Sequence, residues 1–183
     1  MKKIAFPLII AAIGLTASAA HAAGPASNGG ILTINGELTA NTCDVSGDGQ
    51  GNNFTVTLPT LSASELSGAG TVAGATGFNI ALQNCTPSTG NVHTFWEYGA
   101  NTLSNGNLLN NGTASNVEVQ LVDYNGAMKV IDASKGDNAQ NSQSVAISGG
   151  KANLQYAAQY VSPAGGATAG SVTTSVTYSM AYQ

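Results

Sequence analysis

Arginine is absent from this chain of 183 residues, and charged residues of all kinds make up only 8% of it. Five lysines face nine carboxylates, which gives a formal net charge of −4 at pH 7. Nucleic-acid binding needs clustered lysine and arginine that displace counterions from phosphates. A polybasic membrane anchor needs the same residues. The composition therefore excludes nucleic acid and argues against an electrostatic membrane partner.

Long hydrophobic runs are missing everywhere except at the start. A basic tripeptide, MKK, precedes an apolar stretch over residues 4–20, and Ala20-His21-Ala22 gives the small-x-small pattern of a cleavage site. This pattern predicts a secretory signal peptide over residues 1–22. A membrane-spanning helix is the alternative, but the stretch is rich in Ala, Gly, Ser and Thr and is short of about 20 strongly apolar residues. Cleavage leaves 161 residues with no membrane span.

Cysteine and histidine are scarce. Beyond residue 22 the chain has Cys43, Cys85 and one histidine, His93. Export to the periplasm or beyond leads to a compartment where disulfides persist. A Cys43–Cys85 bond would close a loop of about 42 residues and stabilise the fold by about 4 kcal/mol on the chain-entropy account. Zinc is the alternative, but two thiols and one imidazole are a poor ligand set. We therefore predict the disulfide and no metal.

Recognisable catalytic motifs are also missing. No Gly-x-Ser-x-Gly elbow accompanies His93, which we interpret as a surface or half-buried strand residue. Ser148 and Lys151 match Ser-x-x-Lys, but the intervening Gly-Gly is a poor helix interior, so a turn is predicted. Residues 44–53 lack the spacing of a calcium loop. We predict neither an enzyme nor a cofactor.

Three aromatic residues, Trp96, Tyr98 and Tyr124, could present flat faces to a sugar. Packing in the core or across strands is the alternative interpretation, and we favour it. A sugar-binding surface stays open as a hypothesis at this point.

Short β-type runs separated by turn signals dominate the rest of the chain, which holds 23 glycines. Asn125-Gly126 lies between two such runs and is a strong hairpin signal. One helical turn is predicted near residues 62–66, and no longer segment has helical periodicity. The pattern predicts a single all-β domain, a β-sandwich. The predicted strands are 31–46, 54–58, 77–85, 92–98, 117–121, 128–131, 145–147, 154–161 and 172–182.

The last predicted strand runs to the final residue. Its alternate residues share one face, made by Val172, Thr174, Val176, Tyr178, Met180 and Tyr182, while the other face is Ser, Thr, Ala and Gln183. A frayed tail would not keep this alternation, so the strand is predicted to be paired.

In order along the chain, several segments together resemble a pilin of the chaperone–usher pathway, close to the major subunit family of type 1 fimbriae. They are NGGILTINGEL (28–38), CDV (43–45), GFNIAL (77–82) with Cys85, NVEVQLVD (116–123) with Gly126, and Tyr156-x-Ala158-x-Tyr160. The terminal strand adds a penultimate tyrosine, Tyr182, and a glycine fourteenth from the end, Gly170. Residues 46–76, 88–115 and 133–143 match poorly.

The resemblance implies an immunoglobulin-like sandwich that lacks its last strand and is completed by a donated one. It implies a donor-strand extension over residues 23–39 and a pilin domain over residues 40–183. The donor residues would be Gly30, Leu32, Ile34, Gly36 and Leu38. The acceptor groove, which a chaperone fills first, would be formed by Gly170, Val172, Thr174, Val176, Tyr178, Met180, Tyr182 and Gln183.

The implied partners are neighbouring subunits of a homopolymer, a periplasmic chaperone and an outer-membrane usher, and the implied location is an extracellular surface fimbrium. Alternatives remain from the sequence. Residues 32–38 could instead be a strand of the protein's own sheet. The chain could be a minor or adaptor pilin, or a secreted lectin-like binding module.

Overall fold

The computed structural model describes residues 32–36 and 42–183. The predicted signal peptide, Gly30 and Leu38 lie outside these residues. The chain divides into two units, Met1–Leu38 and Thr39–Gln183, which we describe separately. In the first unit, residues 32–36 belong to no helix or strand, and Leu32 and Ile34 are more than four-fifths exposed. The strand predicted over residues 31–46 was therefore wrong at residues 32–36.

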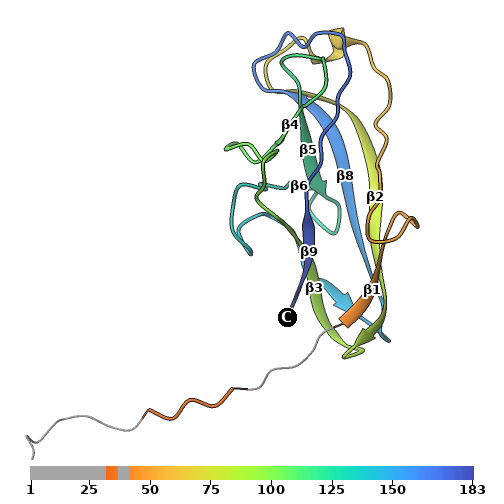
Figure 1. The fold of residues 1–183 in the computed structure, drawn as a ribbon, viewed down its shortest axis with the longest axis vertical. Helices are drawn as coiled ribbons and strands as arrows, with labels where there is room; N and C mark the ends of the chain where they lie inside the picture. Colours follow the sequence, from red (N-terminus) through yellow and green to blue (C-terminus); the bar gives the residue numbers. More distant parts are fainter. Residues whose placement is uncertain (1–31, 37–41) are drawn as a thin grey trace, which may run out of the picture. The chain divides into compact units, whose positions relative to one another are not determined.

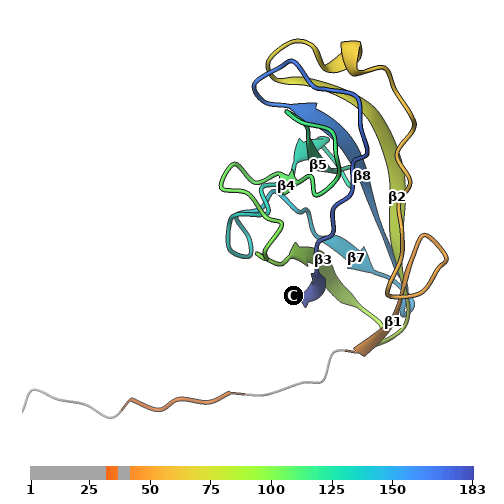
Figure 2. The same ribbon diagram turned by 45° about the horizontal axis from the view of Figure 1, so that its top comes forward.

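The larger sheet of the second unit is built on two long central strands, β2 (Thr71–Thr86) and β8 (Ala152–Ser162). They pair antiparallel from Thr71↔Ser162 to Leu82↔Ala152, and Figure 2 shows them side by side. The order is β1-β2-β8-β5-β4, with β6 paired to β5 (Figure 1). The remaining strands are β1 (Thr42–Gly47), β4 (Leu108–Leu109), β5 (Glu118–Asp123) and β6 (Lys129–Val130).

The smaller sheet has the order β7-β3-β9, formed by β7 (Val145–Ile147), β3 (Gly90–Trp96) and β9 (Tyr178–Tyr182). β3 and β9 pair antiparallel from Val92↔Tyr182 to Trp96↔Tyr178. β9 is therefore an edge strand, and one side of its backbone has no neighbour in the sheet as described.

The core joins the two sheets through aromatic contacts. Trp96 on β3 meets Tyr156 on β8 edge-on, with ring centroids 5.3 Å apart, and Phe78 on β2 at 6.3 Å. The alternation expected over residues 77–85 places Phe78, Ile80 and Leu82 inward, where all three are buried. Each such side chain contributes about 1.5–3 kcal/mol on burial, so this layer holds the sandwich together.

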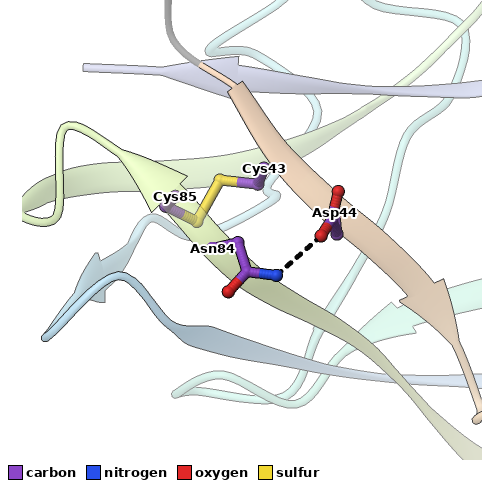
Figure 3. The surroundings of a disulfide bond; sticks show 4 residues. All are labelled: Cys43, Asp44, Asn84 and Cys85. Carbon is purple, nitrogen blue, oxygen red and sulfur yellow. Dashed lines mark hydrogen bonds between the residues drawn. A yellow bond between two sulfur atoms is a disulfide. The ribbon is translucent and has the colours of Figure 1, made fainter.

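Figure 3 shows the predicted disulfide, which joins Cys43 on β1 to Cys85 on β2. Beside it, Asn84 Nδ2 donates to Asp44 Oδ2 at 2.7 Å. The disulfide is confirmed, and the two thiols it uses are not available as zinc ligands.

Most of the predicted elements are present. The sandwich, the 125–126 hairpin and β7 are confirmed, and the predicted helical turn is the 3-10 helix η1 (Ala63–Leu66), capped by Ser62. The strand predicted over residues 77–85 was too short, because β2 begins at Thr71, inside a region expected to be irregular. β4 was missed, since it lies in a region expected to be a loop.

Two other predictions were wrong about pairing. Residues 54–58 and 171–177 are extended but belong to no ladder, so β9 begins only at Tyr178. Both segments lack a neighbouring strand for the same reason: each of them borders a groove on one side.

Candidate binding groove

A groove of about 900 Å³ lies between residues 54–58 and residues 172–180. Both segments are extended, and we call them the N-wall and the C-wall. The floor between them is largely apolar and comes from both sheets; its members are Phe78, Trp96, Leu108, Val119, Leu121 and Ala158.

The backbone of the C-wall is bonded on one side only. The carbonyls of Ser171, Thr173 and Thr177 accept from the N–H groups of Ala114, Asn111 and Glu97 at 2.8–3.0 Å. Because successive peptide groups of an extended chain point to opposite sides, the backbones of the even-numbered residues face the groove. Those of Val172, Thr174 and Val176 make no hydrogen bond to any described residue.

The side chains of the C-wall alternate as the sequence predicted. Even-numbered residues from Val172 to Tyr182 are half-buried, and the odd-numbered ones from Ser171 to Ser179 are exposed. Val172, Val176, Tyr178, Met180 and Tyr182 pack against the core.

The N-wall is bonded on its outer side alone. Gln50 accepts from the N–H of Thr55 at 3.2 Å and donates to its carbonyl at 3.0 Å, so one carboxamide occupies both groups. Gln50 does not line the groove. Phe54, Val56 and Leu58 pack against the core from this wall. The backbones of Val56 and Leu58 have no hydrogen-bond partner within residues 32–36 and 42–183.

Two polar atoms at the groove also lack partners. Trp96 is 2% exposed, and neither its Nε1 nor the buried Oγ1 of Thr174 bonds a described residue. Burial raises the pKa of Tyr178, in the C-wall, above 10.0, and it also raises the pKa of Tyr182, which lies beyond the groove.

Two backbone edges without hydrogen-bond partners among the described residues thus border a largely apolar floor. Edges of this kind can accept a further β-strand, whose alternate side chains would lie against the floor.

The C-wall prediction and the observed groove overlap in part. Val172, Thr174, Val176, Tyr178 and Met180 line the groove, whereas Gly170, Tyr182 and Gln183 do not. At Gly170 a Cβ would lie 2.4 Å from the N of Ala114, so glycine allows this end of the C-wall to approach the 110–115 loop. Gln183 exchanges backbone hydrogen bonds with Asn91 at 2.8 and 3.0 Å.

The N-wall and the floor were missed by sequence reasoning. Phe54, Val56 and Leu58 alternate with threonines, which predicted a strand but not one that borders a gap. Trp96 faces inward at the floor, so the three aromatics do not form an exposed sugar-binding surface.

The other residues weighed as candidate sites lie in separate parts of the described chain. The prediction that His93 is a surface or half-buried residue was wrong, because its side chain is only 2% exposed. The segment that carries Asp137 and Gln140 covers β3 at this point. Asp137 Oδ1 lies 2.6 Å from His93 Nε2. Ser148 and Lys151 form the predicted turn. The described ranges contain no cluster of three or more metal-ligating side chains. Nor do they contain a helix long and apolar enough to cross a membrane.

The structure is a β-sandwich with an apolar groove, and comparisons with known proteins show the family to which the chain belongs. The family described as Type-1 fimbrial protein, A, matches residues 58–183. The chain is 42% identical to the F17 fimbrial protein of Escherichia coli over the whole of both chains. It is 41% identical to the major fimbrial subunit SMF-1 of Stenotrophomonas maltophilia, over 95% of this chain and 99% of that one.

Among solved structures, the P pilus rod subunit PapA is similar in fold, with a TM-score of 0.52 and 21% identity over 77% of this chain and 99% of that one. The chain belongs to the type-1 fimbrial protein family. It is a pilin, with the immunoglobulin-like sandwich of fimbrial subunits.

Proposed function

We propose that this chain polymerises by donor-strand exchange, in which the N-terminal extension of one subunit fills the groove of the next. The observation that carries the proposal is the pair of unpaired backbone edges, Val56 and Leu58 on one wall and Val172, Thr174 and Val176 on the other. A single inserted strand would satisfy both edges at once.

The donor would be residues 28–39. Leu32 and Ile34 are exposed in the described part of this segment, and no described atom lies within 4 Å of a Cβ built on Gly36. Gly30, Leu32, Ile34, Gly36 and Leu38 alternate as a strand with one inward face would. Each aliphatic residue buried in the groove would contribute about 1.5–3 kcal/mol, and each new backbone hydrogen bond about 0.5–1.5 kcal/mol.

An open groove of this kind aggregates unless it is covered during export. We therefore include in the proposal a signal peptide over residues 1–22, a periplasmic chaperone that fills the groove first, and an outer-membrane usher where exchange takes place. Gly170, Tyr182 and Gln183 extend the C-wall beyond the groove and would contact the chaperone. The product would be an extracellular surface fimbrium with no catalytic activity.

Thermal unfolding of two forms of the chain tests the missing-strand proposal. One form begins at Leu38 and ends at Gln183. The other adds a flexible linker and a second copy of residues 28–39 after Gln183. We expect the extended form to be monomeric and to unfold tens of degrees higher. A matched control carries Leu32→Asp and Ile34→Asp in the added copy and should lose the gain. Equal unfolding temperatures of the first two forms would show that the fold is already complete without a donor.

A further inference from the structure

One side chain links the C-wall to the loop that precedes the N-wall. Tyr178, in the C-wall, donates its phenol hydrogen to the backbone carbonyl of Asn52 at 2.7 Å. Asn52 lies two residues before the start of the N-wall. Among the described residues this is the sole hydrogen bond between residues 52–58 and residues 172–180. The C-wall is therefore tied at one position to the loop that leads into the N-wall.

The ring of Tyr178 is held by contacts on both sides. Phe54 of the N-wall meets it edge-on, with centroids 5.7 Å apart and planes at 70°. Trp96 of the floor lies 6.0 Å away. These contacts fix the direction in which the phenol crosses the groove.

The acceptor end of the bond is also anchored. The loop that carries Asn52 is closed by a hydrogen bond from Gly47 N to Gly51 O at 2.7 Å. Asp48 N donates to Asn79 O on β2 at 2.7 Å, which fastens the loop to the larger sheet. A Cβ on Gly47 would collide with the ring of Phe54, so the loop and the N-wall are in close contact.

We expect the bond to run on the core side of an inserted strand and to leave the path of that strand open. Tyr178 shares its face with Val176 and Met180, and all three pack against the core. A strand inserted between the walls would lie in the plane of the smaller sheet, above these side chains. It would need the walls about two strand spacings apart, each spacing being about 4.8 Å.

We propose that Tyr178 is a positioning residue that holds the empty groove at the width of one strand. This inference rests on the proposed function, because it assigns a role within donor-strand uptake. A groove set to the right width before the strand arrives reduces the ordering cost of binding. The anchored loop and the rigid phenol together supply that preorganisation.

Binding of a fluorescein-labelled peptide of residues 28–39 to chain 23–183 tests the proposal. Tyr178→Phe keeps the ring contacts and removes the bond to Asn52. We expect the dissociation constant to rise about 2- to 10-fold, the range for loss of one hydrogen bond, with most of the change in the association rate constant. Tyr98→Phe is the matched control, since Tyr98 is 67% exposed and does not line the groove.

A pH series separates positioning from a merely structural role. The phenolate cannot donate to the Asn52 carbonyl, so wild-type affinity should fall at alkaline pH relative to that of Tyr178→Phe at the same pH. Equal affinity and equal pH profiles for the two proteins would overturn the positioning role. A higher association rate constant for Tyr178→Phe would also overturn the positioning role, because the bond would then hinder entry of the peptide. Failure of the wild-type chain to bind the peptide would instead refute the donor-strand proposal itself.

Discussion

The carboxamide of Gln140 pairs with both backbone groups of Trp96, as a neighbouring strand would. Its Oε1 accepts from the Trp96 N–H at 2.9 Å, and its Nε2 donates to the Trp96 carbonyl at 2.6 Å. β7 pairs with β3 only from Gly90 to Val92, so no strand reaches Trp96 on that side. One buried side chain thus completes the sheet under the floor of the groove.

Gln140→Ala should therefore destabilise the fold strongly. It leaves the N–H and C=O of Trp96 buried without partners, and each orphaned group costs about 1–3 kcal/mol. We expect the free energy of unfolding in urea to fall by about 2–4 kcal/mol. Gln83→Ala, at an exposed position on β2, is the control and should change it little. A loss below about 0.5 kcal/mol for Gln140→Ala would contradict the pairing role.

The double variant Cys43→Ser/Cys85→Ser should also lose stability. The disulfide closes a loop with a sequence separation of 42 residues. Its removal should lower the free energy of unfolding by about 2–4 kcal/mol. Urea unfolding of the variant and of the oxidised wild type measures the difference. Wild type kept in a reducing agent should match the variant, and an unchanged midpoint for both would refute the prediction.

A charge placed on the groove face should block strand uptake. Both Val176 and Thr177 line the groove. The side chain of Val176 is half-buried on the face that packs against the core, whereas the side chain of Thr177 is exposed on the opposite face. We expect Val176→Lys to weaken binding of the 28–39 peptide by more than about 10-fold, because burying an unpaired ammonium is costly. Thr177→Lys adds the same charge one residue away and should bind normally. Equal affinities for the two variants would mean that the peptide does not enter this groove.

On the donor side, Gly36→Leu should prevent fibre assembly without unfolding the subunit. Gly36 belongs to the first unit, and a branched side chain there would enter a slot whose walls are set for one strand. Electron microscopy of cells that express the variant counts the fibres, and periplasmic subunit levels report folding. The control is Thr33→Leu, because Thr33 lies on the opposite face of the predicted donor strand. This variant should assemble normally. A normal number of fibres on cells that express Gly36→Leu would contradict the prediction.

Alkaline pH should lower the free energy of unfolding, because three tyrosines are buried or half-buried in the folded state. Burial raises the pKa of Tyr156, Tyr178 and Tyr182 above the ordinary value of 10.0. Their contribution is fully present below pH 10.0, and it is lost as pH rises from there through the folded-state pKa values. Urea unfolding between pH 8 and 11 should therefore show a decline that begins near 10.0, and Tyr182→Phe should reduce its slope. A slope equal to that of wild type would contradict the assignment for Tyr182.

Local pattern accounts for much of what could be predicted. Alternation of Phe78, Ile80 and Leu82 identified a strand with one buried face, and Asn125-Gly126 identified a hairpin, because both signals depend on neighbouring residues alone. The two cysteines of the chain left one possible intramolecular pairing. The terminal alternation from Val172 to Tyr182 identified a face that packs inward, and the ordered motifs pointed to the pilin family.

Other features depend on residues that are far apart in the chain. The sequence pattern predicted that residues 54–58 and 172–180 are extended, but it could not show that they lie on either side of one groove. That arrangement arises because β9 pairs with β3 on one side only, while the loop before the N-wall is fastened to β2. The Tyr178–Asn52 bond joins positions 126 residues apart. Alternation specifies which side of a strand is buried, whereas the packing of the two sheets specifies what lies beside it.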